Sequence, residues 1–160
     1  MTSDPYTLRE TDTINDAWEV MIGKHIRHIP IIDSDKHVLG LITQRDVLAA
    51  TDPRAILDAK TASHEISSDI RLADIMTRDV KVIDQSDSLR QAALYLQAHK
   101  YGCLPVVVDD RLVGIITDSD FIEIAINLLE QAELTEEAIE DEIEMEDAMF
   151  EIEPSEADEV

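Results

Sequence analysis

The chain has 160 residues, 44% of them hydrophobic, and a formal net charge of −23 at pH 7. This apolar content is typical of a folded domain and excludes a chain that is disordered throughout. The acidic excess argues against a nucleic-acid partner, because binding phosphates depends on Lys and Arg that displace counterions. No run approaches the roughly 18 apolar residues that cross a bilayer, and the first ten residues lack a signal-peptide pattern, so we expect a cytoplasmic protein without a membrane partner.

The first unit, residues 1–50, is predicted to contain a helix, a strand hairpin and a second helix. Apolar residues from Ile14 to Ile22 recur at helical spacing, and Thr13 with Asp16 has the spacing of a capping box at the start of this helix. The runs HIPII and VLGLIT, separated by DSDKH, are typical of two buried strands joined in a hairpin. The stretch RDVLAA then returns to a helical pattern.

The second unit, residues 70–131, is predicted to repeat this order after a polar linker at residues 51–69 that holds a proline and a serine cluster. Ser88 and Gln91 form the capping box here, and the strand runs are CLPVVV and LVGIIT. A last helix carries an apolar stripe made of Phe121, Ala125, Leu128, Leu129 and Ala132.

The two units are copies of one another. An offset of 75 places Met1-Thr2 on Met76-Thr77, and an offset of 74 places the heptapeptide GLITQRD on GIITDSD. A unit of about 60 residues buries so small a fraction of its surface that it is only marginally stable alone. We therefore expect the copies to pack about a pseudo-twofold axis. The second copy has IRLAD before its IMT, whereas the first begins at Met1, so either that lead-in is missing or the native chain begins upstream.

The acidic tail, residues 132–160, has two interpretations. It could be a largely disordered extension, or an amphipathic helix that presents Ile139, Ile143 and Phe150 to a partner. Dense like charge at i, i+4 spacing disfavours an isolated helix at neutral pH, so a disordered or partly helical tail is the favoured prediction.

The doubled pattern of a helix, IPII or LPVV, and then GLITQRD or GIITDSD, with DIMTRDV opening the second copy, resembles the cystathionine-beta-synthase (CBS) domain pair over residues 1–131. The free-standing acetoin-utilisation B-type proteins are also similar, on architecture and on the stretch ITDSDF. The resemblance implies an α/β (α+β) fold in which each unit is a small mixed sheet flanked by helices. It also implies a homodimer, and clefts that bind AMP, ADP, ATP or S-adenosylmethionine as a regulatory ligand without a required cofactor.

The resemblance also suggests binding residues. It implies that Thr43 and Thr117 hydrogen-bond the ribose or phosphate of the ligand, and that Asp46 and Asp120 accept the ribose hydroxyls. A carboxylate suits a vicinal diol because its two oxygens can accept two charge-assisted bonds. The same Thr-x-x-Asp spacing is a helix-capping signature that needs no ligand, and capping and binding can coexist. A strand end that runs into a helix amino terminus also presents free amides to an anion.

Further candidates surround these two corners. Arg45 could meet a phosphate, with His25, Arg27 and His28 as helpers, or could be a solvated helix residue. The second copy has Asp118-Ser119 in place of Gln44-Arg45, and the Asp118 carboxylate would repel a phosphate. We therefore expect the first site to prefer a phosphorylated adenosine. The second would take a less anionic ligand such as S-adenosylmethionine, or stay empty. Four apolar residues could sandwich an adenine or belong to the core: Ile29, Ile31, Leu104 and Val106.

No catalytic or metal site is predicted. The chain contains no Gly-rich phosphate loop, nucleophile elbow or H-E-x-x-H, Cys103 is expected to be a core residue, and the two imidazoles of HIRH are too few ligands for zinc. The sequence thus predicts a non-catalytic regulatory module that signals ligand occupancy to a separate effector protein. The alternative is a constitutive dimeric scaffold with vacant clefts, involved in acetoin utilisation.

Overall fold

The computed structural model describes residues 1–51 and 70–150, and it divides into two compact units, Met1–Asp118 and Ser119–Val160. Both predicted repeats, up to the start of the last helix, therefore belong to one unit. The predicted linker lies outside the described residues except for Thr51. Within the described residues, no helix is long and apolar enough to cross a membrane.

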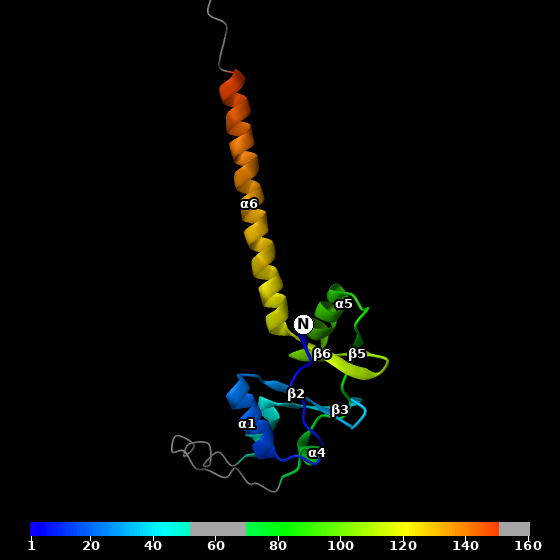
Figure 1. The fold of residues 1–160 in the computed structure, drawn as a ribbon. Helices are drawn as coiled ribbons and strands as arrows, with labels where there is room; N and C mark the ends of the chain where they lie inside the picture. The colour runs from blue at the N-terminus through cyan, green and yellow to red at the C-terminus, as the bar shows by residue number, and fades with distance from the viewer. Residues whose placement is uncertain (52–69, 151–160) are drawn as a thin grey trace, which may run out of the picture. The chain divides into compact units, whose positions relative to one another are not determined.

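The first repeat has the predicted order of elements (Figure 1). Strands β2 and β3 pair antiparallel, with Ile29 opposite Ile42. The capping box at Thr13 is present, because the Asp16 amide donates to the Thr13 hydroxyl and the Asp16 carboxylate accepts from the Thr13 amide. The elements are β1 (Thr2–Ser3), α1 (Ile14–Lys24), β2 (His28–Ile32), β3 (Val38–Thr43) and α2 (Gln44–Ala50).

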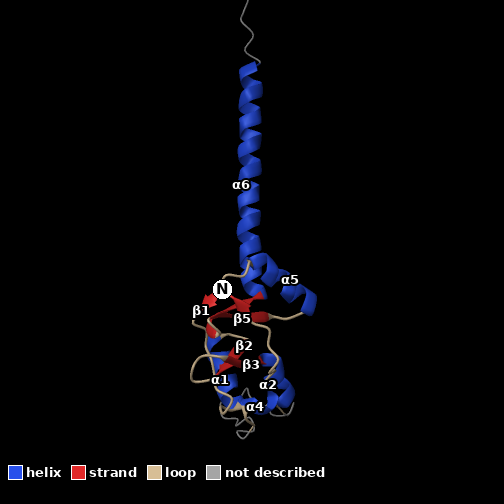
Figure 2. Cartoon of the chain, turned by 90° about the vertical axis from the view of Figure 1, so that its right-hand side faces the viewer, coloured by secondary structure: helices blue, strands red, loops and turns tan. Residues whose placement is uncertain are grey.

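The second repeat follows the same plan, and its strands join β1 in a four-stranded sheet of order β1-β6-β5-β4. Figure 2 shows the labelled strands β1 and β5 of this sheet. The Ser88 side chain caps α5, as its spacing with Gln91 predicts. The elements are α4 (Leu72–Ile75), β4 (Ile83–Asp84), α5 (Leu89–His99), β5 (Cys103–Val108), β6 (Arg111–Thr117) and α6 (Asp118–Phe150). The helix α6 continues without interruption from the end of the repeat into the acidic tail as far as Phe150, so residues 132–150 of the tail are helical.

Each repeat contributes its lead-in segment to the glycine strand of the other. Thr2 pairs with Ile115 on β6, and Thr77 bridges Leu41 on β3 through two backbone hydrogen bonds of 2.9 Å. The glycines allow this close approach, because an ideal Cβ on Gly40 would lie 2.8 Å from the carbonyl oxygen of Thr77. The exchange ties the repeats into one unit.

The hydrophobic core of the first repeat also contains residues from beyond the linker. Leu72 of α4 is fully buried there, and Met76 is almost so. They pack with residues of α1, β2, β3 and α2, which include Ile14, Met21, Ile29, Ile31, Ile42 and Val47. The IRLAD segment therefore completes the core of the first repeat, although it precedes the second in the sequence.

Candidate functional site

The first candidate corner lies where β3 ends and α2 begins. Thr43 has an extended backbone, and its amide and hydroxyl both donate to Oδ2 of Asp46, over 2.8 and 2.6 Å. The Asp46 amide donates back to the Thr43 hydroxyl over 3.2 Å. Buried Val47 anchors this turn to the core. The capping box is therefore formed, but it uses only one carboxylate oxygen, and Oδ1 of Asp46 makes no hydrogen bond to the rest of the described chain.

His28 joins this corner to the second repeat. It lies opposite Thr43 in the β2–β3 register, and its Nε2 is 2.7 Å from the position that a Cβ on Gly102 would occupy. The backbone beside each corner makes the same hydrogen bond in both copies. The Gln44 amide donates to the Arg27 carbonyl over 2.9 Å, and the Asp118 amide donates to the Gly102 carbonyl over 3.2 Å. His28 is thus a contact between the two repeats at the corner end of their hairpins.

Burial sets the protonation of this imidazole. Desolvation lowers the pKa of His28 from its ordinary value of 6.5, with a smaller lowering effect from Arg27, while Asp118 and Asp46 oppose the shift. The ring is therefore neutral at pH 7 and offers a ligand a hydrogen bond rather than a positive charge.

The stability of the protein should fall on mild acidification because of His28. Its folded pKa is lowered, so the unfolded chain binds the proton more readily, and stability is lost as pH falls below about 6.5 toward the folded pKa. Urea unfolding at pH 7.5 and pH 5.5 should show a smaller loss for His28→Gln than for the native chain. Equal losses in the two proteins would contradict the assignment, and an NMR titration of the ring would report the lowered pKa directly.

The second corner differs from the first in charge. Thr117 is the last residue of β6, and Asp118, the first of α6, stands where the first copy has Gln44. Burial, assisted by the Asp118 carboxylate, raises the pKa of Cys103 to about 12, so the thiol stays protonated and behaves as the predicted core residue. Asp120 is the third residue of α6 and belongs to the second compact unit.

The four apolar candidates lie in the protein core. None of their side chains is more than 3% exposed, so they support the corners from beneath and offer no open surface to an adenine in this conformation. They are Ile29 and Ile31 on β2 and Leu104 and Val106 on β5.

The basic candidates remain at the surface. Arg45 and Arg27 are exposed, and Arg27 meets the corner through its backbone carbonyl. His25 is the left-handed residue that ends α1, where its amide donates to the last turn of the helix.

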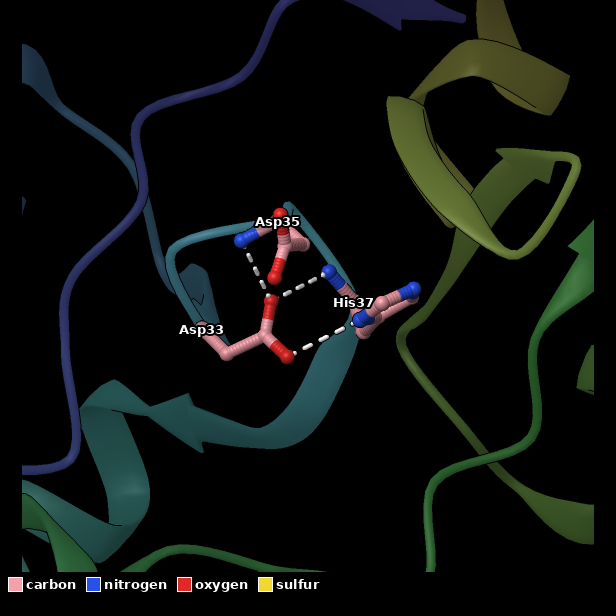
Figure 3. Close-up of side chains that lie close together, drawn as sticks. All are labelled: Asp33, Asp35 and His37. Carbon is pink, nitrogen blue, oxygen red and sulfur yellow. Dashed lines mark hydrogen bonds and ion pairs between the residues drawn. The ribbon is translucent and has the colours of Figure 1, made fainter.

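A separate cluster of possible metal ligands lies at the turn end of the first hairpin, away from the Thr43 corner. The ligand atoms of Asp33, Asp35 and His37 lie within 4.8 Å of one another. Asp33 accepts from the amides of Asp35 and His37 and from Nδ1 of His37, each over 2.9 Å. Figure 3 draws these three contacts as dashed lines. These bonds account for the turn without an ion, and we assign no metal to it.

The same end of the hairpins carries a shallow depression of about 630 Å³. Its walls come from the turns of both hairpins, which meet where His37 bridges Arg111. Its charged lining residues are Lys36, Arg111 and Asp109, so the depression offers little net positive charge to a nucleotide phosphate.

The CBS domain family model matches residues 1–52 and 72–127. The chain therefore belongs to the CBS domain family, as a tandem CBS pair with the mixed α/β architecture expected from the sequence. Its fold is similar to that of the crystal structure of a protein named AcuB, for acetoin utilization, from Vibrio cholerae. That chain is 47% identical, with a TM-score of 0.70 over 83% of this chain and 92% of its own.

Two other solved CBS proteins contain adenosine compounds. The structure of CBSX2 in complex with AMP is 28% identical, with a TM-score of 0.65 over 80% of this chain and 93% of its own. The CBS pair of MJ0100 in complex with 5′-methylthioadenosine and S-adenosyl-L-methionine is 26% identical, with a TM-score of 0.61 over 77% of this chain and 90% of its own.

Curated relatives include much longer enzymes. A homoserine O-acetyltransferase of Methanocorpusculum labreanum is 36% identical over 118 residues, which are 73% of this chain and 21% of that protein. An inosine-5′-monophosphate dehydrogenase of Nitrosopumilus maritimus is 30% identical over 121 residues, 75% of this chain and 22% of that protein. The chain thus spans about a fifth of the length of these enzymes.

Proposed function

We propose that this CBS pair is a non-catalytic, cytoplasmic regulatory module that binds an adenosine-containing ligand between its repeats and signals occupancy to a separate effector protein. The observation that carries the proposal is the Thr43 corner. Its capping box leaves Oδ1 of Asp46 available to accept a ribose hydroxyl beside the contact that joins the two repeats. The AMP complex of CBSX2 and the S-adenosyl-L-methionine complex of MJ0100 support the ligand class.

The two corners are proposed to differ in ligand. The first has the exposed Arg45 at the start of α2 and the exposed Arg27 just before β2, which we propose as partners of a phosphate, and we assign to it AMP, ADP or ATP. The second has the Asp118 carboxylate in place of Gln44, and anionic phosphates would be repelled there. We assign to Thr117 and Asp120 a less anionic ligand such as S-adenosylmethionine, or no ligand. Occupancy would act by favouring one arrangement of the joined repeats, in a proposed homodimer, over another.

Thermal unfolding in a panel of ligands tests this function. A ligand that binds only the folded state adds about 2.7 kcal/mol at 100 times its dissociation constant. We expect AMP, ADP, ATP or S-adenosylmethionine to raise the melting temperature, and inorganic phosphate and adenine alone to have little effect. No shift with any adenosine compound would contradict the proposal.

The alternative is a dimeric scaffold with vacant clefts that acts in acetoin utilisation. The similarity to the Vibrio cholerae protein named for this process favours the pathway without distinguishing a sensor from a scaffold. A scaffold would retain its partner binding while showing no stabilisation by nucleotides, so the ligand panel separates the two.

A further inference from the structure

The helix α6 carries an exposed apolar stripe between Leu129 and Ile143. Leu129, Ile139 and Ile143 are between 51% and 64% exposed, and Ala132 is also exposed. Their spacings of three, seven and four residues place all four on one side of the helix, at seam positions of a heptad pattern in which the sequence has Glu136 between Ala132 and Ile139. We call these four residues the α6 stripe. Apolar residues in this arrangement are typical of a surface that docks a second helix.

The charge around the α6 stripe limits what can cover it. Glu133 and Glu140 border it on one side and Glu142 on the other, at positions where coiled coils form interhelical ion pairs. In all, α6 contains 13 acidic residues and no Lys, Arg or His. A second copy of this helix, or an anionic membrane surface, would therefore meet strong like-charge repulsion. A cationic helix would gain the opposite interaction.

Binding a cationic helix would also relieve repulsion within α6 itself. Glu130 and Glu133 are both exposed and lie three residues apart, at neighbouring positions of the helix surface where like charges repel. A partner that supplies positive charges along the stripe would reduce this repulsion while it covers the apolar residues.

We propose that the α6 stripe docks a basic amphipathic helix of a partner protein, whose Lys or Arg side chains pair with Glu133, Glu140 and Glu142. This interaction goes beyond the proposed ligand binding and is tested without any nucleotide, so the two can fail separately. It uses only the second compact unit, and therefore needs no particular placement of α6 relative to the repeats.

Two synthetic peptides of about 21 residues, or three heptads, provide the test. Both have Leu at the seam positions, and one has Lys and the other Glu at the flanking positions. The full chain should bind the Lys peptide, with an affinity that falls as salt is raised, and should bind the Glu peptide at least tenfold more weakly. Titration calorimetry or fluorescence anisotropy measures both affinities.

Paired variants of α6 locate the binding face. Ile139→Ala with Ile143→Ala should weaken binding of the Lys peptide about tenfold. Leu134→Ala with Met145→Ala should leave the affinity within about twofold, since these residues are at least as exposed but lie on the opposite side of the helix. Alanine is the strongest helix former, so both variants should keep their helical circular dichroism.

Three outcomes would overturn the inference. These are no measurable binding of the Lys peptide at low salt, equal loss of affinity in the two paired variants, or sedimentation showing that the chain self-associates through the stripe. The last outcome would make a second copy the occupant.

Discussion

Replacing Asp46 by alanine should weaken the binding of AMP or ATP by roughly 10- to 100-fold, because a hydrogen bond to a charged group contributes about 1.5–3 kcal/mol. The substitution removes the whole carboxylate, and the contact that we expect the ligand to lose is with Oδ1, which the capping box does not use. The native protein should bind AMP more tightly than 2′-deoxy-AMP, and this preference should shrink in Asp46→Ala if the carboxylate meets the ribose diol. Isothermal titration calorimetry measures both ligands on both proteins.

Asp16 provides a matched control, because it forms the same capping box with Thr13 in α1. Its Oδ2 accepts from the Thr13 amide over 2.8 Å and from the Thr13 hydroxyl over 2.7 Å. Asp16→Ala and Asp46→Ala should each cost about 1 kcal/mol of stability, but only the latter should affect nucleotide affinity. Equal effects of the two on affinity would mean that capping alone matters. Equal loss in Asp46→Ala and Asp120→Ala would contradict the proposed difference between the corners.

Leu72→Ala should destabilise the protein by about 2–5 kcal/mol, which is the largest effect that we expect of a single substitution here. Leu72 is 0% exposed and lies in the core of the first repeat, although it belongs to the segment that opens the second. Removing its side chain leaves a cavity lined by residues of the other repeat. Urea denaturation followed by circular dichroism measures the change.

Leu89→Ala is the control for this substitution. Leu89 is a leucine in the first turn of α5, but it is 55% exposed, so its loss should change stability by no more than about 0.5 kcal/mol. We also expect the two repeats to unfold in a single transition. Two separate transitions, with Leu72→Ala moving only that of the second repeat, would contradict the shared core.

Local pattern was sufficient to predict the main elements of both repeats. The capping boxes at Thr13, Thr43 and Ser88 each form as their spacing indicates, because N-cap chemistry depends on residues three positions apart. The hairpins follow from buried runs separated by turn residues. The doubled heptapeptide indicated the two corners, since it marks the same strand-to-helix step in each copy.

Long-range pairings were not predictable in the same way. The two-residue strand β1 and the single bridge at Thr77 carry too little local pattern to reveal which glycine strand they join. The contact of His28 with Gly102 depends on how the repeats pack. The replacement of Gln44 by Asp118 was visible in the repeat alignment, but its effect on His28 and Cys103 requires their positions in space.

The acidic tail was left open by the sequence between disorder and partial helix, because repulsion at i, i+4 spacing opposes a helix. In the described residues the helix α6 includes residues 132–150 of the tail. The apolar spacing from Leu129 to Ile143 agrees with the helical period over this stretch, and helix formation extends from a helix already begun at Asp118. Residues 151–160 lie outside the described part of the chain.

The exchange of lead-in segments bears on how a duplicated chain could evolve from a single repeat and on how it would behave when cut between the repeats. A single repeat would leave its glycine strand without the neighbour that Thr2 or Thr77 supplies, and would find that neighbour in a second molecule related by twofold symmetry. When both repeats are in one chain, the lead-in segment of one pairs with the glycine strand of the other in the same molecule, at a high effective concentration. Two fragments cut between the repeats would therefore be expected to reassemble with each other in preference to folding as separate halves.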